Sequence, residues 1–88
     1  MEKFTLGLTF TTQTVKQFFS PDFVKSCFLR HQQGDFGDIC QHDTAINIEN
    51  IDRKGRILSS YKNENGETLW IITDAGHGVT TALLPSEY

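Results

Sequence analysis

Residues 55–88 constrain the fold more than any other part of the chain, because three strand-like runs follow one another there. The runs cover residues 56–62, 67–74 and 79–84, are rich in β-branched and aromatic residues, and are separated by two glycine-containing turns. This arrangement is typical of an antiparallel meander. The middle strand is expected at the centre of a sheet because both of its faces are apolar, with Trp70 and Ile72 on one and Leu69, Ile71 and Thr73 on the other.

The amino-terminal residues predict a further strand. Over residues 3–10, apolar side chains alternate with threonine and glycine, and the apolar members are Phe4, Leu6, Leu8 and Phe10. A period of two predicts a strand that buries this apolar face. We expect it to join the sheet at one edge.

Two helix starts follow this strand. Threonines at positions 11, 12 and 14 offer capping oxygens for a short helix that carries Val15, Phe18 and Phe19. Ser20 and Pro21 then supply a capping hydroxyl and a proline at the first helical position, with an acidic residue in the first turn. They predict a helix over residues 21–32 that stops at Gly34 and buries one apolar stripe, made of Phe23, Val24, Cys27 and Phe28.

A weaker helical segment spans about residues 40–51, with Ala45, Ile46 and Ile51 expected to face inward and Asn47 as a polar interruption. Lys54 and Gly55 end it. The predicted order is therefore strand, helices, then three strands, which indicates an α+β two-layer domain with a mainly antiparallel four-stranded sheet. The chain of 88 residues is long enough for one domain, residues 1–88, and has no linker or repeat.

Composition limits the classes of partner. Eight basic and eleven acidic residues give a net charge of −3, which disfavours a dedicated nucleic-acid-binding protein. Two cysteines, Cys27 and Cys40, are too few for a disulfide framework. The sequence contains no run of about 18 apolar residues, the length that a membrane span requires. We therefore expect a cytoplasmic protein with reduced thiols and no membrane partner.

The connector after the second helix reads Gly-Asp-Phe-Gly-Asp over residues 34–38. We expect a structural turn in which the side chains of Asp35 and Asp38 cap backbone N–H groups while Phe36 packs on the core.

Two alternatives give this region chemistry. His31, Cys40 and His42 together with an aspartate are ligands that zinc prefers, but their spacing matches no established zinc motif, so we expect no metal. A small metal-independent RNase of the toxin type needs a general base, a general acid and a cation for the phosphate. The residues that could supply these groups are His31, Arg56, Tyr61, Thr73 and His77.

Four motifs resemble a family of small uncharacterised bacterial proteins that are carried on plasmids, prophages and other mobile elements. The motifs are Arg30-His31-x-x-Gly34-Asp35-Phe36-Gly37-Asp38, Ile57-Leu58-Ser59-x-Tyr61, Leu69-Trp70-Ile71-Ile72-Thr73-Asp74 and Thr80-Thr81-x-Leu83-Leu84-Pro85-x-x-Tyr88. The resemblance covers roughly residues 29–88. It implies a genetic setting but no activity.

One departure from the family pattern bears on the RNase alternative. Where the family usually has Asp-Arg-Ser, this chain has Gly76-His77-Gly78. A histidine substitutes only partly for an arginine that binds phosphate. Two flanking glycines are also expected to leave the imidazole without a fixed position.

The leading hypothesis from the sequence is an accessory protein of a mobile element that binds a host or phage protein without catalysis. No cofactor is expected, and the oligomeric state is left open. The expected binding residues are Arg30, His31, Asp35, Asp38, Arg56 and Tyr61. The alternative is the small RNase.

Overall fold

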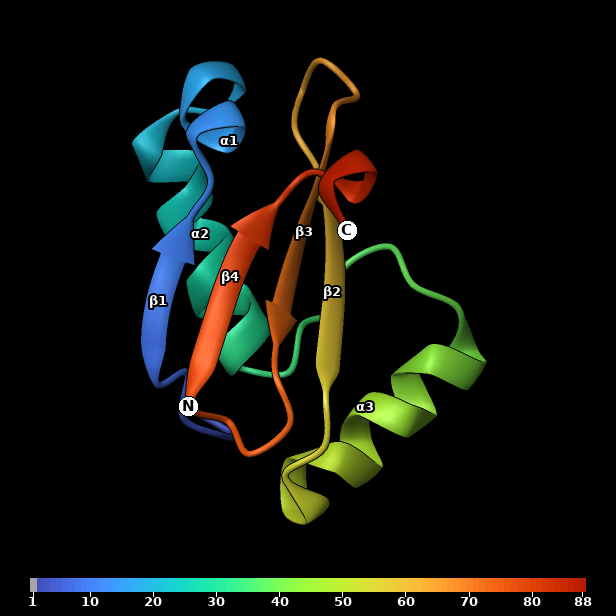
Figure 1. The fold of residues 1–88 in the computed structure, drawn as a ribbon. Coiled ribbons are helices and arrows are strands. Elements are labelled where there is room, and N and C mark those ends of the chain that lie inside the picture. Colours follow the sequence, from blue (N-terminus) through green and yellow to red (C-terminus); the bar gives the residue numbers. More distant parts are fainter. Residues whose placement is uncertain (1) are drawn as a thin grey trace.

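The protein is an α+β domain built around one four-stranded sheet, as a computed structural model describes it for residues 2–88 (Figure 1). The strand order across the sheet is β1-β4-β3-β2. Along the chain the elements are β1 (Leu8–Thr11), α1 (Gln13–Phe18), α2 (Pro21–Gln32), α3 (Gln41–Arg53), β2 (Ile57–Lys62), β3 (Thr68–Thr73), β4 (Val79–Leu83) and the short 3₁₀ helix η1 (Pro85–Glu87).

The predicted meander is confirmed. β2 pairs antiparallel with β3, and β3 pairs antiparallel with β4, so β3 lies in the interior of the sheet. β1 joins at the edge, as expected, but it runs parallel to β4, with Leu8 opposite Val79. The sheet is therefore mostly antiparallel with one parallel pair. The helices between β1 and β2 return the chain to the end of the sheet where β1 began. β1, β2 and β4 therefore run in one direction, and β3 runs in the other.

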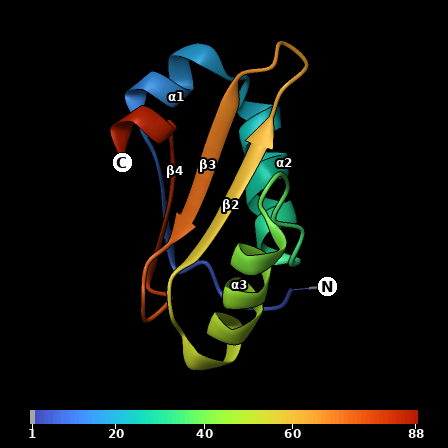
Figure 2. The same ribbon diagram turned by 90° about the vertical axis from the view of Figure 1, so that its right-hand side faces the viewer.

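Helices α2 and α3 lie on one side of the sheet, and among residues 2–88 no long helix lies on the opposite face (Figures 1 and 2). The main core lies between α2 and the sheet, where Val24 and Cys27 pack against Tyr61, Leu69 and Ile71. Apolar burial of this kind drives the two layers together. The two-layer arrangement predicted from the order of elements is confirmed.

The caps of α1 and α2 also agree with the sequence. The Thr12 hydroxyl accepts a hydrogen bond from the N–H of Val15, and the Ser20 hydroxyl accepts one from the N–H of Phe23. These bonds satisfy N–H groups that have no partner within the helix. In α1, Val15 is buried, whereas Phe18 is exposed.

The prediction for the amino-terminal strand was wrong in part. The strand begins at Leu8, because Gly7 has a φ of +68° and turns the backbone. The turn separates the four apolar residues: Phe4 is buried, while Leu8 and Phe10 are 67% and 53% exposed. A Cβ atom at Gly7 would lie 2.2 Å from the carbonyl oxygen of Gly78, so the close approach of these two segments requires glycine.

The inward face of α3 was also predicted wrongly in part. Ala45 and Ile46 are exposed, whereas Ile51 packs against the buried cluster that contains Ile57, as expected. Asn47, which is only 4% exposed, also points inward. Its side-chain amide donates to the carbonyl oxygen of Leu58 at 2.7 Å and accepts from the N–H of Leu58 at 3.2 Å. An amide can satisfy both backbone groups of a strand residue, which an apolar side chain cannot do.

Candidate functional site

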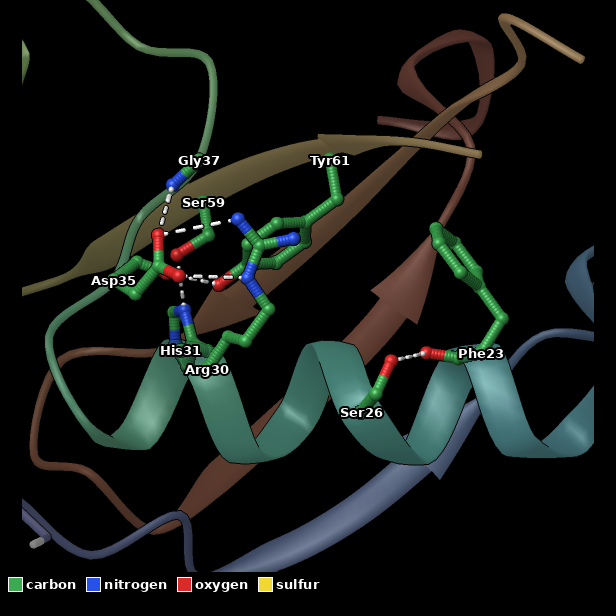
Figure 3. A network of polar contacts seen from close by, with 8 residues as sticks. All are labelled: Phe23, Ser26, Arg30, His31, Asp35, Gly37, Ser59 and Tyr61. Carbon is green, nitrogen blue, oxygen red and sulfur yellow. Dashed lines mark hydrogen bonds and ion pairs between the residues drawn. The ribbon is translucent and has the colours of Figure 1, made fainter. Parts of the chain in front are cut away.

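Four of the predicted site residues gather where the last turn of α2 meets β2 (Figure 3). Nε of Arg30 lies 2.7 Å from a carboxylate oxygen of Asp35. The guanidinium of Arg30 also lies over the ring of Tyr61, 4.6 Å from its centroid. The Tyr61 hydroxyl donates to the backbone carbonyl of Asp35 at 2.6 Å, and its side chain is buried.

The charges of this cluster compensate each other. The hydrogen bond from Arg30 holds the pKa of Asp35 below its usual value, and the same bond raises the pKa of Arg30. Asp35 also accepts from the N–H of Gly37 at 3.2 Å, so its predicted capping role is confirmed. An arginine already paired with a carboxylate offers little net positive charge to a phosphate. Burial raises the pKa of Tyr61, which therefore stays protonated.

His31, the neighbour of Arg30, points into the domain and is fully buried. Its Nδ1 lies 2.5 Å from the hydroxyl oxygen of Ser59, and its Nε2 lies 2.8 Å from that of Thr73. The Thr73 hydroxyl in turn lies 2.8 Å from the Thr80 hydroxyl, which donates to the carbonyl oxygen of Leu6 at 2.7 Å. One helix residue is thereby bonded to residues of β2 and β3 and, through Thr73, to β4.

The donor in each of these hydrogen bonds can be assigned by starting from the carbonyl oxygen of Leu6, which can only accept. The Thr80 hydroxyl uses its one proton on Leu6, so it accepts from Thr73. Thr73 then has no proton left for His31, so Nε2 of His31 carries a hydrogen and donates to Thr73. Nδ1 is therefore an acceptor, and the Ser59 hydroxyl donates to it.

Burial lowers the pKa of His31 from 6.5 to about 3, so the ring is neutral at physiological pH. A neutral imidazole could act as a general base, but the one lone pair available for this already accepts a proton from Ser59. A general base must reach the proton that it abstracts. His31 is enclosed and its hydrogen bonds are complete, which is the arrangement of a residue that holds the core together.

The prediction that His77 has no fixed position was wrong. The side chain of His77 is buried, its Nε2 lies 2.9 Å from the carbonyl oxygen of Gly55, and its ring packs 5.4 Å from that of Phe4. Phe4 also contacts His31 edge-on at 5.2 Å. Long-range packing against the amino-terminal segment and residue 55 fixes the turn, and the two glycines do not loosen it.

Arg56 lies away from these residues. Its side chain donates to the hydroxyl of Tyr88 and lies 5.4 Å from the centroid of the Tyr88 ring. Tyr88 packs edge-on against Trp70, on the sheet face opposite to α2. The five residues of the RNase alternative are thus divided: His31 and Thr73 are bonded to each other, Tyr61 and His77 are buried nearby, and Arg56 lies beyond the sheet.

Two further predictions concern Asp38 and a metal site. Asp38 is exposed, and within residues 2–88 its carboxylate caps no N–H group; only its backbone N–H bonds to Ser60, at 2.7 Å. Its predicted capping role was therefore wrong. Over the same residues, no three His, Cys, Asp or Glu side chains lie close enough to hold a metal ion. Cys40 is instead the N-cap residue of α3, where its Sγ accepts from the N–H of Asp43 at 3.5 Å.

The predicted binding residues do not form one surface. His31 and Tyr61 are buried, Arg30 is paired with Asp35, and Arg56 lies on the other face. Cys27 is buried too, and burial raises the pKa of its thiol to about 11, which leaves it inert as a nucleophile.

The two edges of the sheet differ sharply. Along the outer edge of β2, both backbone groups of Leu58 bond to Asn47, and both backbone groups of Ser60 bond to the turn over residues 36–38. The outer edge of β1 has no strand beside it within residues 2–88 (Figure 1). Leu8 and Phe10, both largely exposed, belong to this edge strand. Natural proteins usually cover or blunt such an edge.

Sequence reasoning missed Ser59, Thr80, Asn47 and the open edge. Ser59 lies between Ile57 and Tyr61 on the buried face of β2, so a polar residue in an apolar register was the available signal for a buried partner. The pairing of that serine with His31 could not be read from the sequence. The open edge depends on the strand order, which no local pattern reveals.

Comparisons with known proteins add no relative, since neither protein-family models, nor curated proteins, nor solved structures give a match to this chain. Within residues 2–88, no helix combines the length and the apolar character that crossing a membrane requires.

Proposed function

We propose that this chain is an accessory protein of a mobile genetic element and that it acts by binding a host or phage protein, without catalysis. The observation that carries the proposal is the exposed pair Leu8 and Phe10 on an edge strand whose outer backbone groups have no partner within residues 2–88. An exposed apolar patch beside an open sheet edge is a feature of protein-binding surfaces. The genetic setting rests on the sequence resemblance.

The arrangement of the polar residues supports binding over RNA cleavage. His31 and Thr73 are buried and bonded to each other, so neither presents a free group to a substrate. Arg30 is paired with Asp35, and Arg53 lies 3.6 Å from Glu49, so two of the three arginines that could form a basic groove are paired with acids. The net charge of −3 also opposes the approach of RNA.

Capture from a host lysate, compared between matched variants, tests the binding part. The double substitution Leu8→Ser with Phe10→Ser removes the exposed apolar pair from β1. Ile48→Ser removes a residue that is 58% exposed on α3, at the opposite edge of the sheet. We expect one host or phage protein to be retained by the parent and by Ile48→Ser and to be lost from the double variant. Equal retention by all three proteins would contradict the proposed surface.

An activity gel that contains RNA tests the absence of catalysis. The protein of 10.0 kDa is refolded in the gel, so that cleavage can be assigned to its own band and not to a contaminating nuclease. We expect no cleared band at this mass. A cleared band that is lost in Arg56→Ala, whose exposed side chain can be replaced without disturbing the core, would replace the binding hypothesis with the RNase alternative.

A further inference from the structure

A groove runs along the free edge of β1, between this strand and helices α1 and α2. Its volume is about 440 Å³. Most of the residues that line it are apolar, among them Leu6, Val24, Phe28 and Leu29, and its charged lining residues are Lys16 and Lys25. The groove lies on the α2 side of the sheet, whereas Leu8 and Phe10 project from the other face of the same strand, because side chains alternate along it.

Beside this groove, β1 turns backbone groups outward that have no partner in the described part of the chain, residues 2–88. The N–H of Leu8 donates to Gly78 at 2.9 Å, and the N–H of Thr12 donates to Ala82 at 3.1 Å, so these groups point toward β4. Backbone direction alternates along a strand, and therefore the N–H and C=O groups of Thr9 and Thr11 point to the outer edge. The side chains of the same two threonines line the groove.

The groove has a basic end and an apolar end. α1 follows β1 directly, so Lys16 lies near the Thr11 end of the strand. α2 runs back in the opposite direction, because its last residue, Gln32, bonds to Lys3 at 2.8 Å and to Phe4 at 3.1 Å. Lys25, in the first half of α2, is thus on the same side as Lys16, and Leu29 lies toward the start of β1.

We propose that the free edge of β1 binds an extended segment of another protein, which adds to the sheet as a fifth strand and places apolar side chains and an acidic side chain into the groove. This deepens the proposed function and rests on it, since it names the kind of partner segment. Strand addition uses backbone hydrogen bonds for affinity and side-chain pockets for specificity. Thr9 and Thr11 supply the backbone groups, and the groove supplies the pocket.

Charge selects this occupant. The chain is acidic overall, yet both charged residues of the groove are lysines, and neither belongs to the ion pairs found within residues 2–88. A second copy of this chain, paired through the same strand about a two-fold axis, would run antiparallel and bring β1, which carries no acidic residue, to the groove. Such a copy leaves both lysines without a carboxylate from the added strand, whereas an acidic residue on a partner segment satisfies both lysines.

Two synthetic peptides of ten residues serve as probes. Both have blocked termini and alternate valine with threonine, and they differ only in whether two adjacent positions at one end hold glutamate or lysine. We expect the glutamate peptide to bind at least tenfold more tightly in fluorescence anisotropy. We also expect it to slow the hydrogen exchange of the Thr9 and Thr11 amides, which a contact through side chains alone would not do. Equal affinity for both peptides would overturn the inference.

Variants locate the binding. Lys25→Glu and Lys62→Glu change the net charge equally, but Lys62 is an exposed residue of β2, at the opposite edge of the sheet. We expect about tenfold weaker binding of the glutamate peptide for Lys25→Glu and unchanged binding for Lys62→Glu. Thr9→Pro removes an outward N–H, which an edge strand tolerates, and should abolish binding. Should Thr9→Pro not fold, a peptide with N-methylated backbone amides removes the same bonds from the other side and should bind no better than the lysine peptide.

Failure of this inference can be distinguished from failure of the proposed function. A host protein that is captured equally well by the parent, Lys25→Glu and Thr9→Pro would overturn docking at the β1 edge and leave protein binding in place. Self-association of the parent, abolished by Thr9→Pro, would overturn the inference in favour of a second copy. RNA cleavage in the activity gel would overturn the proposed function itself.

Discussion

The buried histidine makes stability depend on pH in a window that can be calculated. The unfolded chain binds a proton at His31 below pH 6.5, whereas burial lowers the pKa of this residue in the folded protein to about 3. The free energy of unfolding contains the full contribution of this residue above pH 6.5. It falls as the pH is lowered toward 3, because the unfolded state then binds more protons than the folded state.

The size of the effect follows from the same two values. One pKa unit corresponds to about 1.4 kcal/mol, so lowering the pH from 7 to 5 should reduce the free energy of unfolding by about 2 kcal/mol through His31 alone. Carboxylates with lowered pKa values, such as Asp35, contribute mainly below pH 4, outside this window. Between pH 7 and pH 5, the change in the free energy of unfolding therefore reports mainly on histidine protonation.

Urea unfolding at pH 7 and at pH 5 measures this difference for the parent and for two variants. His31→Gln keeps a donor for Thr73 but cannot take up the proton, so its loss between the two pH values should be smaller than that of the parent by about 2 kcal/mol. His42→Gln removes an exposed histidine from α3 and should retain the loss of the parent. An equal loss in the parent and in His31→Gln would refute the assignment of a neutral, buried His31.

Five other substitutions have consequences that thermal or urea unfolding can measure. Gly7→Ala should lower stability by more than about 2 kcal/mol because its Cβ would meet the backbone of the adjoining turn, whereas Gly76→Ala, which has a φ of +92° and open space around it, should lower it by about 1–2 kcal/mol through backbone strain alone. Asn47→Leu should lower stability by about 2 kcal/mol, since both backbone groups of Leu58 at the β2 edge lose their partner, and should also increase aggregation in light scattering. Asp35→Ala should lower stability by about 1 kcal/mol and Asp38→Ala by less than about 0.5 kcal/mol; equal effects would contradict the assigned roles in the turn.

The parts of the fold that the sequence predicts are those that depend on neighbouring residues. The alternation around Trp70 and Ile72, the cap at Ser20 and the glycine that follows α2 all act within a few positions, and the structure agrees with them. The error at the amino terminus has a non-local cause. The positive φ of Gly7 accommodates Gly78, which lies far away in the sequence, so the alternation of Phe4 with Leu8 indicated a longer strand than the packing allows.

In the candidate site, too, the sequence identifies residue types, whereas long-range packing decides their role. His31, Tyr61 and Thr73 have the residue types of a catalytic site, and the sequence brought them together as candidates. Their burial decides against an accessible site. Ser59 and Thr80 complete the hydrogen bonds of His31 and Thr73 inside the domain. An interior polar network and an active site can contain the same residue types, and only the exposure of the groups separates them.

Photo-cross-linking in cells most directly tests the central claim that this chain binds another protein through the β1 edge. A photoreactive phenylalanine analogue is placed at position 10 in one variant and at position 48, on α3, in a matched variant. We expect one discrete adduct with a host or phage protein at position 10 and none at position 48. An adduct of equal yield at both positions, or no adduct at position 10 in cells that contain the folded chain, would contradict binding through the β1 edge.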